Sequence, residues 1–141
     1  MDLAEYKKKF FTNPHPERRF AVRGIQGASI HYRDHSAALE FLQRVFGPPA
    51  YIEGEFTHGW KLGETWLSVF PSEVGNASNM EIPVYMESAD DVDKLYQAFI
   101  EAGAAGEPPE NTLMYESVRI AFVQDPFGVA WMLVANTAKD K

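Results

Sequence analysis

The sequence contains the same order of predicted elements twice, and this repeat constrains the fold more than any single residue does. In the first half, a strand over 27–33 leads into a helix that Asp34 caps and Gly47 ends. Three strand-like runs follow this helix, over 50–55, 58–62 and 65–70. The first half is therefore predicted to be a strand, an amphipathic helix and three strands.

The second half repeats this pattern. A strand is predicted over 81–87, where Pro83 favours an edge or strand-start position. Ser88 or Asp90 can cap the helix that follows. Its apolar side chains recur at helical spacing: Val92, Leu95, Tyr96, Phe99 and Ile100. A strand near 113–115 comes next, before a pair of strands. Because one unit alone leaves a face of its sheet uncovered, we expect the two units to pack together in an α+β fold.

The strand pair over 118–134 consists of two apolar runs around a tight turn, Asp-Pro-Phe-Gly at 125–128. In such a turn the proline suits the second position, the aspartate can bond to nearby backbone, and the glycine tolerates a left-handed conformation. In the first strand, Val118 and Ile120 alternate with Arg119. We expect Val118 and Ile120 to face the helices, which would leave Arg119 facing an enclosed space.

The formal charge of −7 is unevenly distributed. Residues 1–23 carry six Lys and Arg against three Asp and Glu, a net charge of +3, so residues 24–141 carry a net charge of −10. An acidic body disfavours nucleic-acid binding, which depends on phosphate neutralisation by basic side chains. The same charge modestly favours cationic ligands.

The 141-residue chain contains no cysteine, which excludes disulfides, thiolate nucleophiles and sulfur-ligated metals. It contains no apolar run long enough to span a membrane, and its first eleven residues lack the apolar core of a signal peptide. We therefore expect a cytoplasmic protein that binds neither membranes nor nucleic acid.

Residues in both halves match the motifs of a known superfamily. In the first half these are Ile30-x-Tyr32-x-Asp34, Ala37-Ala38-Leu39-x-Phe41 and Leu62-Gly63-x-x-Trp66-Leu67. In the second half they are Asp90-Asp91-Val92-Asp93-x-Leu95-Tyr96, Glu101-Ala102-Gly103-Ala104, Arg119 and Asp125-Pro126-Phe127-Gly128-x-x-Trp131. With these motifs the chain resembles the vicinal oxygen chelate superfamily of glyoxalase I, bleomycin-resistance proteins and extradiol dioxygenases. It looks most like the PhnB-like glyoxalase branch.

The resemblance implies two βαβββ modules that pair into a curved mixed sheet around a U-shaped cleft, and we expect a homodimer. The implied domain covers 25–135 and resembles the glyoxalase and bleomycin-resistance domain, with modules at about 25–71 and 80–135. Residues 1–24 would form an N-terminal extension with a short helix near its start, and 136–141 a C-terminal tail.

Metal-using members of the superfamily hold their ion with side chains from the first and last strands of each module. The resemblance aligns three of these positions with Gly27, Ser68 and Met132, and the fourth falls near Glu81, the one possible carboxylate. A divalent ion needs about three or more protein ligands, which glycine, serine and methionine do not supply. We therefore expect no metal and no other cofactor.

The candidate ligand-binding residues are those predicted to face the cleft: Ser29, His31, Trp60, Trp66, Ser68, Tyr85, Arg119 and Met132. The aromatic rings could stack on a flat or cationic ligand, and Arg119 could hold a carboxylate or phosphate. Each residue type also has a structural interpretation. His31 could be a hydrogen-bonded wall residue, the aromatic rings could be core, and Arg119 could pair with an acidic side chain. We predict Trp131 on the helix side, and we assign no catalytic residue.

The leading hypothesis is a metal-free protein that binds a small organic molecule in an aromatic-lined cleft. The acidic body favours a cationic ligand and Arg119 favours an anionic one, so the ligand charge stays open. One alternative is a lyase, isomerase or dioxygenase whose metal is held by His31, His58 and Glu81. Another is a partner-binding module in which residues 1–24 dock on a second chain or on a dimer mate.

Overall fold

The first module is built from five elements in the computed structural model, which describes residues 1–138. They are β1 (Gly27–Tyr32), α2 (His35–Phe46), β2 (Tyr51–Glu53), β3 (Thr57–Leu62) and β4 (Thr65–Pro71). The strands form one sheet in the order β1-β4-β3-β2, in which β1 runs parallel to β4 and the other pairs are antiparallel. This is the predicted strand, helix and three strands.

The second module repeats the arrangement with one short strand added. Its elements are β5 (Glu81–Tyr85), α3 (Ala89–Glu101), β6 (Ala105–Gly106), β7 (Glu110–Leu113), β8 (Ser117–Gln124) and β9 (Ala130–Asn136). The sheet order is β5-β9-β8-β6, and β7 also pairs with β8. The α+β fold with two βαβββ modules is thereby confirmed. The strand expected near 113–115 begins and ends earlier, because Met114 and Glu116 close a backbone hydrogen bond in the turn between β7 and β8.

Both long helices begin and end where the sequence indicates, but their caps differ in detail. The Ser88 hydroxyl accepts a hydrogen bond from the Asp91 amide at 3.2 Å and caps α3, as predicted. Asp34 occupies the N-cap of α2 but makes no side-chain cap bond. Its carboxylate instead accepts from the Asn76 amide at 2.9 Å, so the side chain connects the helix start to the loop after β4. Gly47 ends α2 with a φ of 83°, which favours glycine.

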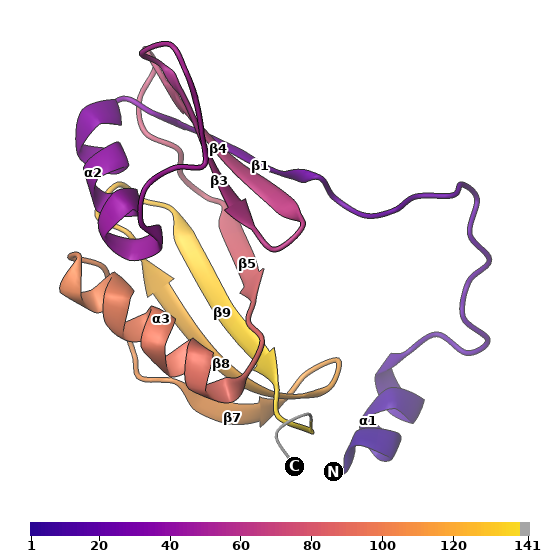
Figure 1. Ribbon diagram of the computed structural model, residues 1–141. Helices are drawn as coiled ribbons and strands as arrows, with labels where there is room; N and C mark the ends of the chain where they lie inside the picture. The colour runs from indigo at the N-terminus through magenta and orange to yellow at the C-terminus, as the bar shows by residue number, and fades with distance from the viewer. Residues whose placement is uncertain (139–141) are drawn as a thin grey trace.

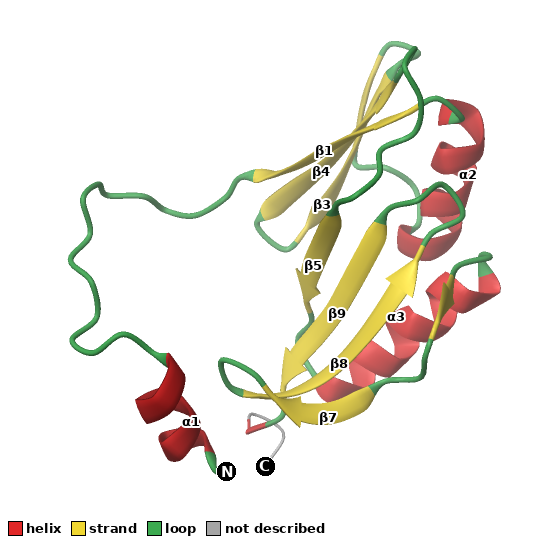
Figure 2. Ribbon diagram, turned by 180° about the vertical axis from the view of Figure 1, so that it is seen from behind, coloured by secondary structure: helices red, strands yellow, loops and turns green. Residues whose placement is uncertain are grey.

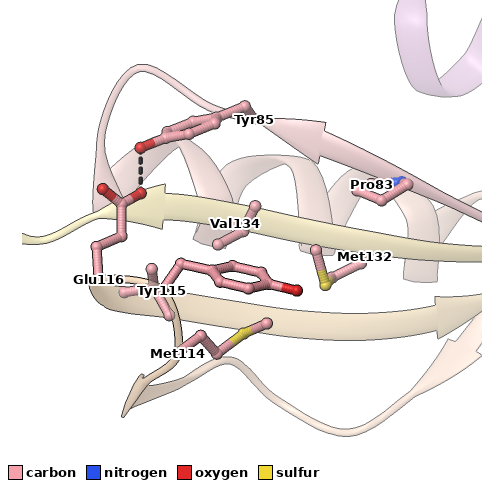
Figure 3. A pocket seen from close by; sticks show the side chains of 8 residues that line it. Pro83, Tyr85, Met114, Tyr115, Glu116, Met132 and Val134 are labelled. Atoms are coloured by element: carbon pink, nitrogen blue, oxygen red, sulfur yellow. Dashed lines mark hydrogen bonds between the residues drawn. The ribbon is translucent and has the colours of Figure 1, made fainter. Parts of the chain in front are cut away.

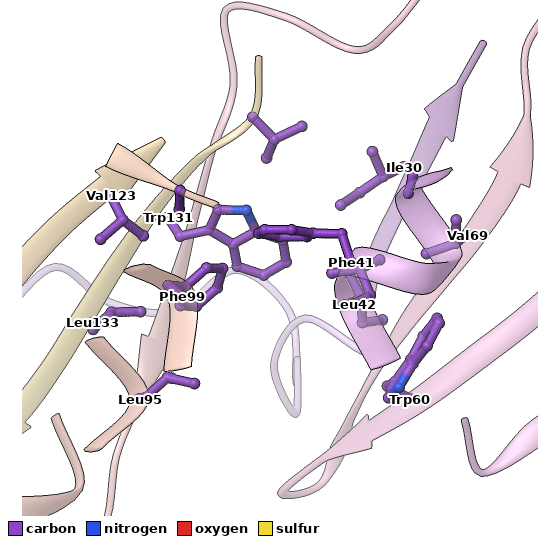
Figure 4. Packing of buried hydrophobic residues seen from close by; sticks show 14 of the residues in the cluster. Ile30, Phe41, Leu42, Trp60, Val69, Leu95, Phe99, Val123, Trp131 and Leu133 are labelled. Atoms are coloured by element: carbon purple, nitrogen blue, oxygen red, sulfur yellow. The ribbon is translucent and has the colours of Figure 1, made fainter. Parts of the chain in front are cut away.

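The two helices lie on the same side of the two sheets (Figures 1 and 2). The apolar core lies between the helices and the sheets. Phe99 of α3 packs against Phe41 and Phe46 of α2, with ring centroids 6.0 and 5.7 Å apart. Trp131 of β9 packs on Phe99 at 5.4 Å (Figure 4), which confirms its predicted place on the helix side. One apolar core therefore serves both modules, as expected for units that cannot bury their sheets alone.

The N-terminal extension lies apart from the two sheets. Helix α1 (Leu3–Phe10) begins with a capping box between Asp2 and Glu5. The chain from Phe11 to Gln26 then runs as an arm on the side of the sheets opposite α2 and α3 (Figures 1 and 2). Within residues 1–138, none of the helices has the length and apolar character needed to cross a membrane. Half of the expected C-terminal tail, residues 139–141, lies outside the described residues.

Candidate functional site

Each sheet has one face packed on the helices and one face directed away from them, which we call the open face. On the first module, Ser29 and His31 of β1 lie on the open face beside Ser68 and Phe70 of β4, their register partners. The His31 and Phe70 rings stack with centroids 5.2 Å apart. The structure thus brings Ser29, His31 and Ser68 together on one surface, as the strand alternation predicted.

Trp66 lies on the same open face, in register with Gly27 and Lys61. The Lys61 ammonium is 4.9 Å from the centre of the Trp66 ring, which is within cation–π range. The face of this indole therefore already accommodates a positive charge supplied by the chain itself.

The open face of the second module is apolar and carries a small cavity. Val118, Ile120 and Val134 form a cluster there that is separate from the main core. The cavity measures about 290 Å³ and is lined by Pro83, Tyr85, Met114, Tyr115, Glu116, Val118, Met132 and Val134 (Figure 3). Tyr85 and Met132 were predicted on this face and are found there.

Three lining residues of this cavity, Met114, Tyr115 and Glu116, were not predicted as site residues. They form the turn before β8, part of which is predicted from the sequence as a strand. The Tyr85 hydroxyl donates a hydrogen bond to the Glu116 carboxylate (Figure 3), and this bond raises the pKa of Tyr85 above its ordinary value. A short turn of mixed apolar and polar residues gives no periodic signal that would have identified them.

Arg119 does not face the cleft, so its predicted placement is wrong. Its Nε donates to Asp93 of α3 at 2.7 Å, and its Nη1 donates to Asn111 of β7 at 3.1 Å. The alternation along β8 was predicted correctly, but Val118 and Ile120 occupy the open face and Arg119 the helix face. The error arose because the apolar side chains were assigned to the helices, whereas the open face of β8 is apolar as well. The ion-pair alternative is the one observed.

Trp60 is also absent from the cleft. It pairs with Leu67 on the helix face of the first sheet, and its side chain is almost fully buried, with 2% exposed. Its indole Nε1 donates to the Gly47 carbonyl oxygen at 2.8 Å. Trp60 therefore belongs to the core beneath α2, which is the structural interpretation given above.

The three residues of the metal-dependent alternative lie apart. His58 faces α2, where its ring centroid is 5.8 Å from that of His35, while His31 lies on the opposite face of the same sheet. Glu81 belongs to β5 of the other module. Across residues 1–138, no three or more His, Asp or Glu side chains come together in a way that could hold a metal ion.

The positions that align with the metal ligands of the superfamily fit a divalent ion poorly. A Cβ atom at Gly27 would lie 1.8 Å from the Trp66 carbonyl oxygen, so β4 leaves no room for a side chain there. Ser68 and Met132 are weak ligands for zinc, nickel or iron(II). The donor set that remains does not suit a resident metal.

A larger cavity of about 1060 Å³ lies between the modules. Its walls come from β5, from the β3–β4 hairpin, and from Phe46 and Leu95 on the two helices. Trp66 of the first module and Tyr85 of the second both line it. Five charged residues line it, four acidic and one basic: Glu64, Glu81, Glu87, Asp91 and Lys61. Pro83 and Tyr85 also line the smaller cavity, so the two cavities share a wall.

The model of the Glyoxalase/Bleomycin resistance protein/Dioxygenase superfamily matches residues 24–133. The chain therefore belongs to this superfamily, the one that the sequence motifs resemble. A search of curated proteins found no match.

Several solved structures share the fold. A glyoxalase/bleomycin resistance protein from Albidiferax ferrireducens T118 gives a TM-score of 0.69 at 13% identity, over 79% of this chain and 98% of that one. A lactoylglutathione lyase from Agrobacterium tumefaciens gives 0.62 at 16% identity, over 81% and 94%. The fosfomycin resistance protein FosX from Mesorhizobium loti gives 0.61 at 17% identity, over 85% and 98%. At these identities the likeness concerns the fold alone.

Proposed function

We propose that this protein binds a small organic molecule in the cavity between its two modules and uses no resident metal to do so. The observation that carries the proposal is the cavity itself. At about 1060 Å³ it has the size of a site for a small ligand, and both modules contribute aromatic side chains to its wall. Trp66 and Tyr85 offer ring faces to the ligand, and the flanking apolar residues offer it further contacts.

The charges around the cavity favour a ligand with a positively charged group. Arg119 supplied the argument for an anionic ligand, and it lies on the helix face in an ion pair with Asp93. The charged residues that line the cavity are four carboxylates and Lys61. The Lys61 ammonium lies over the face of the Trp66 ring. A ligand ammonium could take this position if the lysine side chain moved aside.

The other candidate residues have secondary roles in this proposal. Ser29, His31 and Ser68 lie on the open face that continues from Trp66, so they would contact a ligand that extends beyond the cavity. Met132 lines the smaller cavity and would offer an adaptable apolar contact to a ligand that reaches past Pro83 and Tyr85. Arg119 and Trp60 receive no ligand contact, because both side chains are held on the helix faces.

We further propose that the chain belongs to the PhnB-like branch and forms a homodimer. The turn motif Asp125-Pro126-Phe127-Gly128 followed by Trp131 supports the branch. The exposed apolar side chains on the open face of the second module, Tyr85 and Phe122 among them, support a dimer because a partner would cover them.

The alternative function is a metal-dependent lyase, isomerase or dioxygenase. Its support is that the superfamily includes dioxygenases by name and that one similar structure is a lactoylglutathione lyase. The donor set described above argues against it. Mass spectrometry of the untagged protein after dialysis against divalent ions distinguishes the two: near-stoichiometric metal would favour the enzyme, and its absence would favour the binding protein.

A thermal-shift screen with matched aromatic cations, anions and neutral molecules tests the proposal. We expect cations to raise the Tm, because a ligand that binds only the folded state stabilises it. The shift should shrink in Trp66→Leu and persist in Phe56→Leu, a matched change of an exposed ring that does not line the cavity. Equal shifts in both variants would show that the ligand binds elsewhere.

A further inference from the structure

Strand β5 forms one edge of the second sheet, and it borders the large cavity between the modules. It pairs with β9 on one side, and within residues 1–138 no strand pairs with its other side. Figures 1 and 2 show that β5 is the strand of the second sheet nearest to the first module. The side of β5 away from β9, which we call the outer edge, is therefore directed toward the first module.

The backbone of β5 lines the cavity together with its side chains. Side chains alternate between the two faces of a strand, so a cavity that touches one face alone is lined by every second residue. Here every residue from Met80 to Glu87 lines the cavity. A continuous run of this kind indicates that the cavity lies against the edge of the strand, where consecutive residues are all accessible.

The hydrogen bonds at the two ends of β5 show which backbone groups point to the outer edge. The Met80 carbonyl oxygen and the Met86 amide both bond to β9, at 3.1 and 2.7 Å. The backbone groups of successive residues in a strand point to opposite sides, so the even-numbered residues of β5 bond to β9. The backbone groups of Glu81 and Pro83 are therefore directed away from β9 and toward the cavity.

Proline changes the hydrogen-bonding character of the outer edge. Pro83 has no N–H, so the edge lacks a donor at this position and keeps the carbonyl oxygens of Glu81 and Pro83 as acceptors. The missing donor also makes the addition of a further β-strand unfavourable, because the new ladder would lack a hydrogen bond. A small ligand that matches this edge therefore donates hydrogen bonds to carbonyl oxygens.

The charges around the cavity select among such donors. Four carboxylates and Lys61 line the cavity, so a positively charged donor is favoured over a neutral one. A protonated amine combines charge with N–H groups, whereas a quaternary ammonium group has no N–H to donate. Aromatic rings alone would favour the quaternary group, because a primary ammonium ion is strongly hydrated and costs more to remove from water. The two kinds of cation therefore distinguish recognition by the edge from recognition by the rings.

We propose that the outer edge of β5 selects a primary or secondary ammonium ligand, whose N–H groups donate to the backbone carbonyl oxygen of Glu81 or of Pro83. The carboxylates that line the cavity attract the charge, and the carbonyl oxygens of the edge orient it. This inference rests on the proposed binding of a small molecule in the same cavity. It adds the chemical class of the cation and the backbone groups that recognise it.

Calorimetric titration with benzylammonium and with benzyltrimethylammonium tests the proposal, because the two cations share a ring and a charge and differ in their N–H groups. We expect benzylammonium to bind at least about tenfold more tightly, a factor that one hydrogen bond from a charged donor can supply. Equal affinities, or tighter binding of the quaternary cation, would overturn the proposal and leave the proposed function standing. Absence of binding by either cation would overturn both.

Two proline variants test whether the preference for benzylammonium arises at β5. Pro83→Ala restores an N–H to the outer edge, where it opposes an ammonium group, so the preference should fall at least about threefold. Pro108→Ala changes an exposed proline that lines neither cavity, and this matched control should keep the full preference. Circular dichroism checks that both variants remain folded. An unchanged preference in Pro83→Ala, or tighter binding of an uncharged capped peptide than of benzylammonium to the natural chain, would overturn the proposal.

Discussion

The hydroxyl of Tyr32, at the end of β1, donates a hydrogen bond to the carboxylate of Asp125, in the turn before β9, across 3.1 Å. The two residues belong to different modules, and both are buried. Asp125 also accepts from the Phe127 and Val129 amides at 2.9 and 3.0 Å and from the Trp131 indole at 3.2 Å. Burial, and then the neighbouring Asp125, raise the pKa of Tyr32 well above its ordinary value. The Asp125 carboxylate therefore stabilises the turn before β9 and connects it to β1 of the other module.

Removal of the Asp125 carboxylate should destabilise the protein more than removal of the Tyr32 hydroxyl. Tyr32→Phe loses one hydrogen bond to a charged acceptor and should cost about 1–2 kcal/mol. Asp125→Ala leaves four donors without their acceptor and should cost about 3 kcal/mol or more. Urea denaturation of the two variants measures both free energies of unfolding. A larger loss of unfolding free energy in Tyr32→Phe than in Asp125→Ala would contradict the role of Asp125 as the shared acceptor of these hydrogen bonds.

Arg119 should matter little for ligand binding. Its ion pair with Asp93 is partly exposed, with 25% and 45% of the two side chains accessible, so Arg119→Gln should cost about 1 kcal/mol at most. The affinity for any ligand found in the thermal-shift screen should remain unchanged. A large loss of affinity in Arg119→Gln, with stability preserved, would place this guanidinium in the binding site after all.

Stability should decline as the pH falls below about 6.5, the ordinary pKa of histidine. Burial and the nearby His58 lower the pKa of His35 in the folded state, so the unfolded chain takes up a proton that the folded chain refuses. The stabilisation is fully present above the ordinary value and is lost as the pH falls through it. Urea midpoints measured between pH 8 and pH 5 test this. The decline should be smaller in His35→Gln than in His15→Gln, a control in the exposed arm.

Gly27 should not accept a side chain. A Cβ atom there would collide with the Trp66 carbonyl oxygen, so Gly27→Ala should destabilise the protein by about 2–3 kcal/mol, the upper range for overpacking. Ser29→Ala, two residues along the same strand face, serves as the control and should change little. Gly27→His should likewise fail to create a metal site in calorimetric titration with zinc. An unchanged stability of Gly27→Ala would show that β4 moves aside easily.

The repeat of strand, helix and three strands was sufficient to predict the α+β fold and most of its elements. Helical spacing and turn residues are local signals, so the bounds of α2 and α3 and the turn at Asp125 followed from them. The two-residue strand β6 and the turn at 114–116 have no such signal, because short irregular segments take their shape from tertiary contacts.

The candidate site was predictable in part, and Arg119 and Trp60 show where the limit lies. Strand alternation determines which residues share a face, but it does not say which face meets the helices. On β1 the small and polar residues at 27, 29 and 31 identified the open face correctly. On β8 both faces are apolar, so the choice required knowledge of how α3 packs on the strand, where Asp93 of the helix pairs with Arg119. Cavity shape likewise depends on side chains from both modules.

Metal-independent binding of a cation in the cavity between the modules is tested most directly by calorimetric titration with benzyltrimethylammonium, an aromatic cation, before and after exhaustive treatment with a chelator. We expect saturable binding at one site per chain, with the same affinity in both samples and a clear loss of affinity in Trp66→Leu. Binding that disappears with the chelator and returns only with a divalent ion would contradict it. That result would favour the metal-dependent alternative.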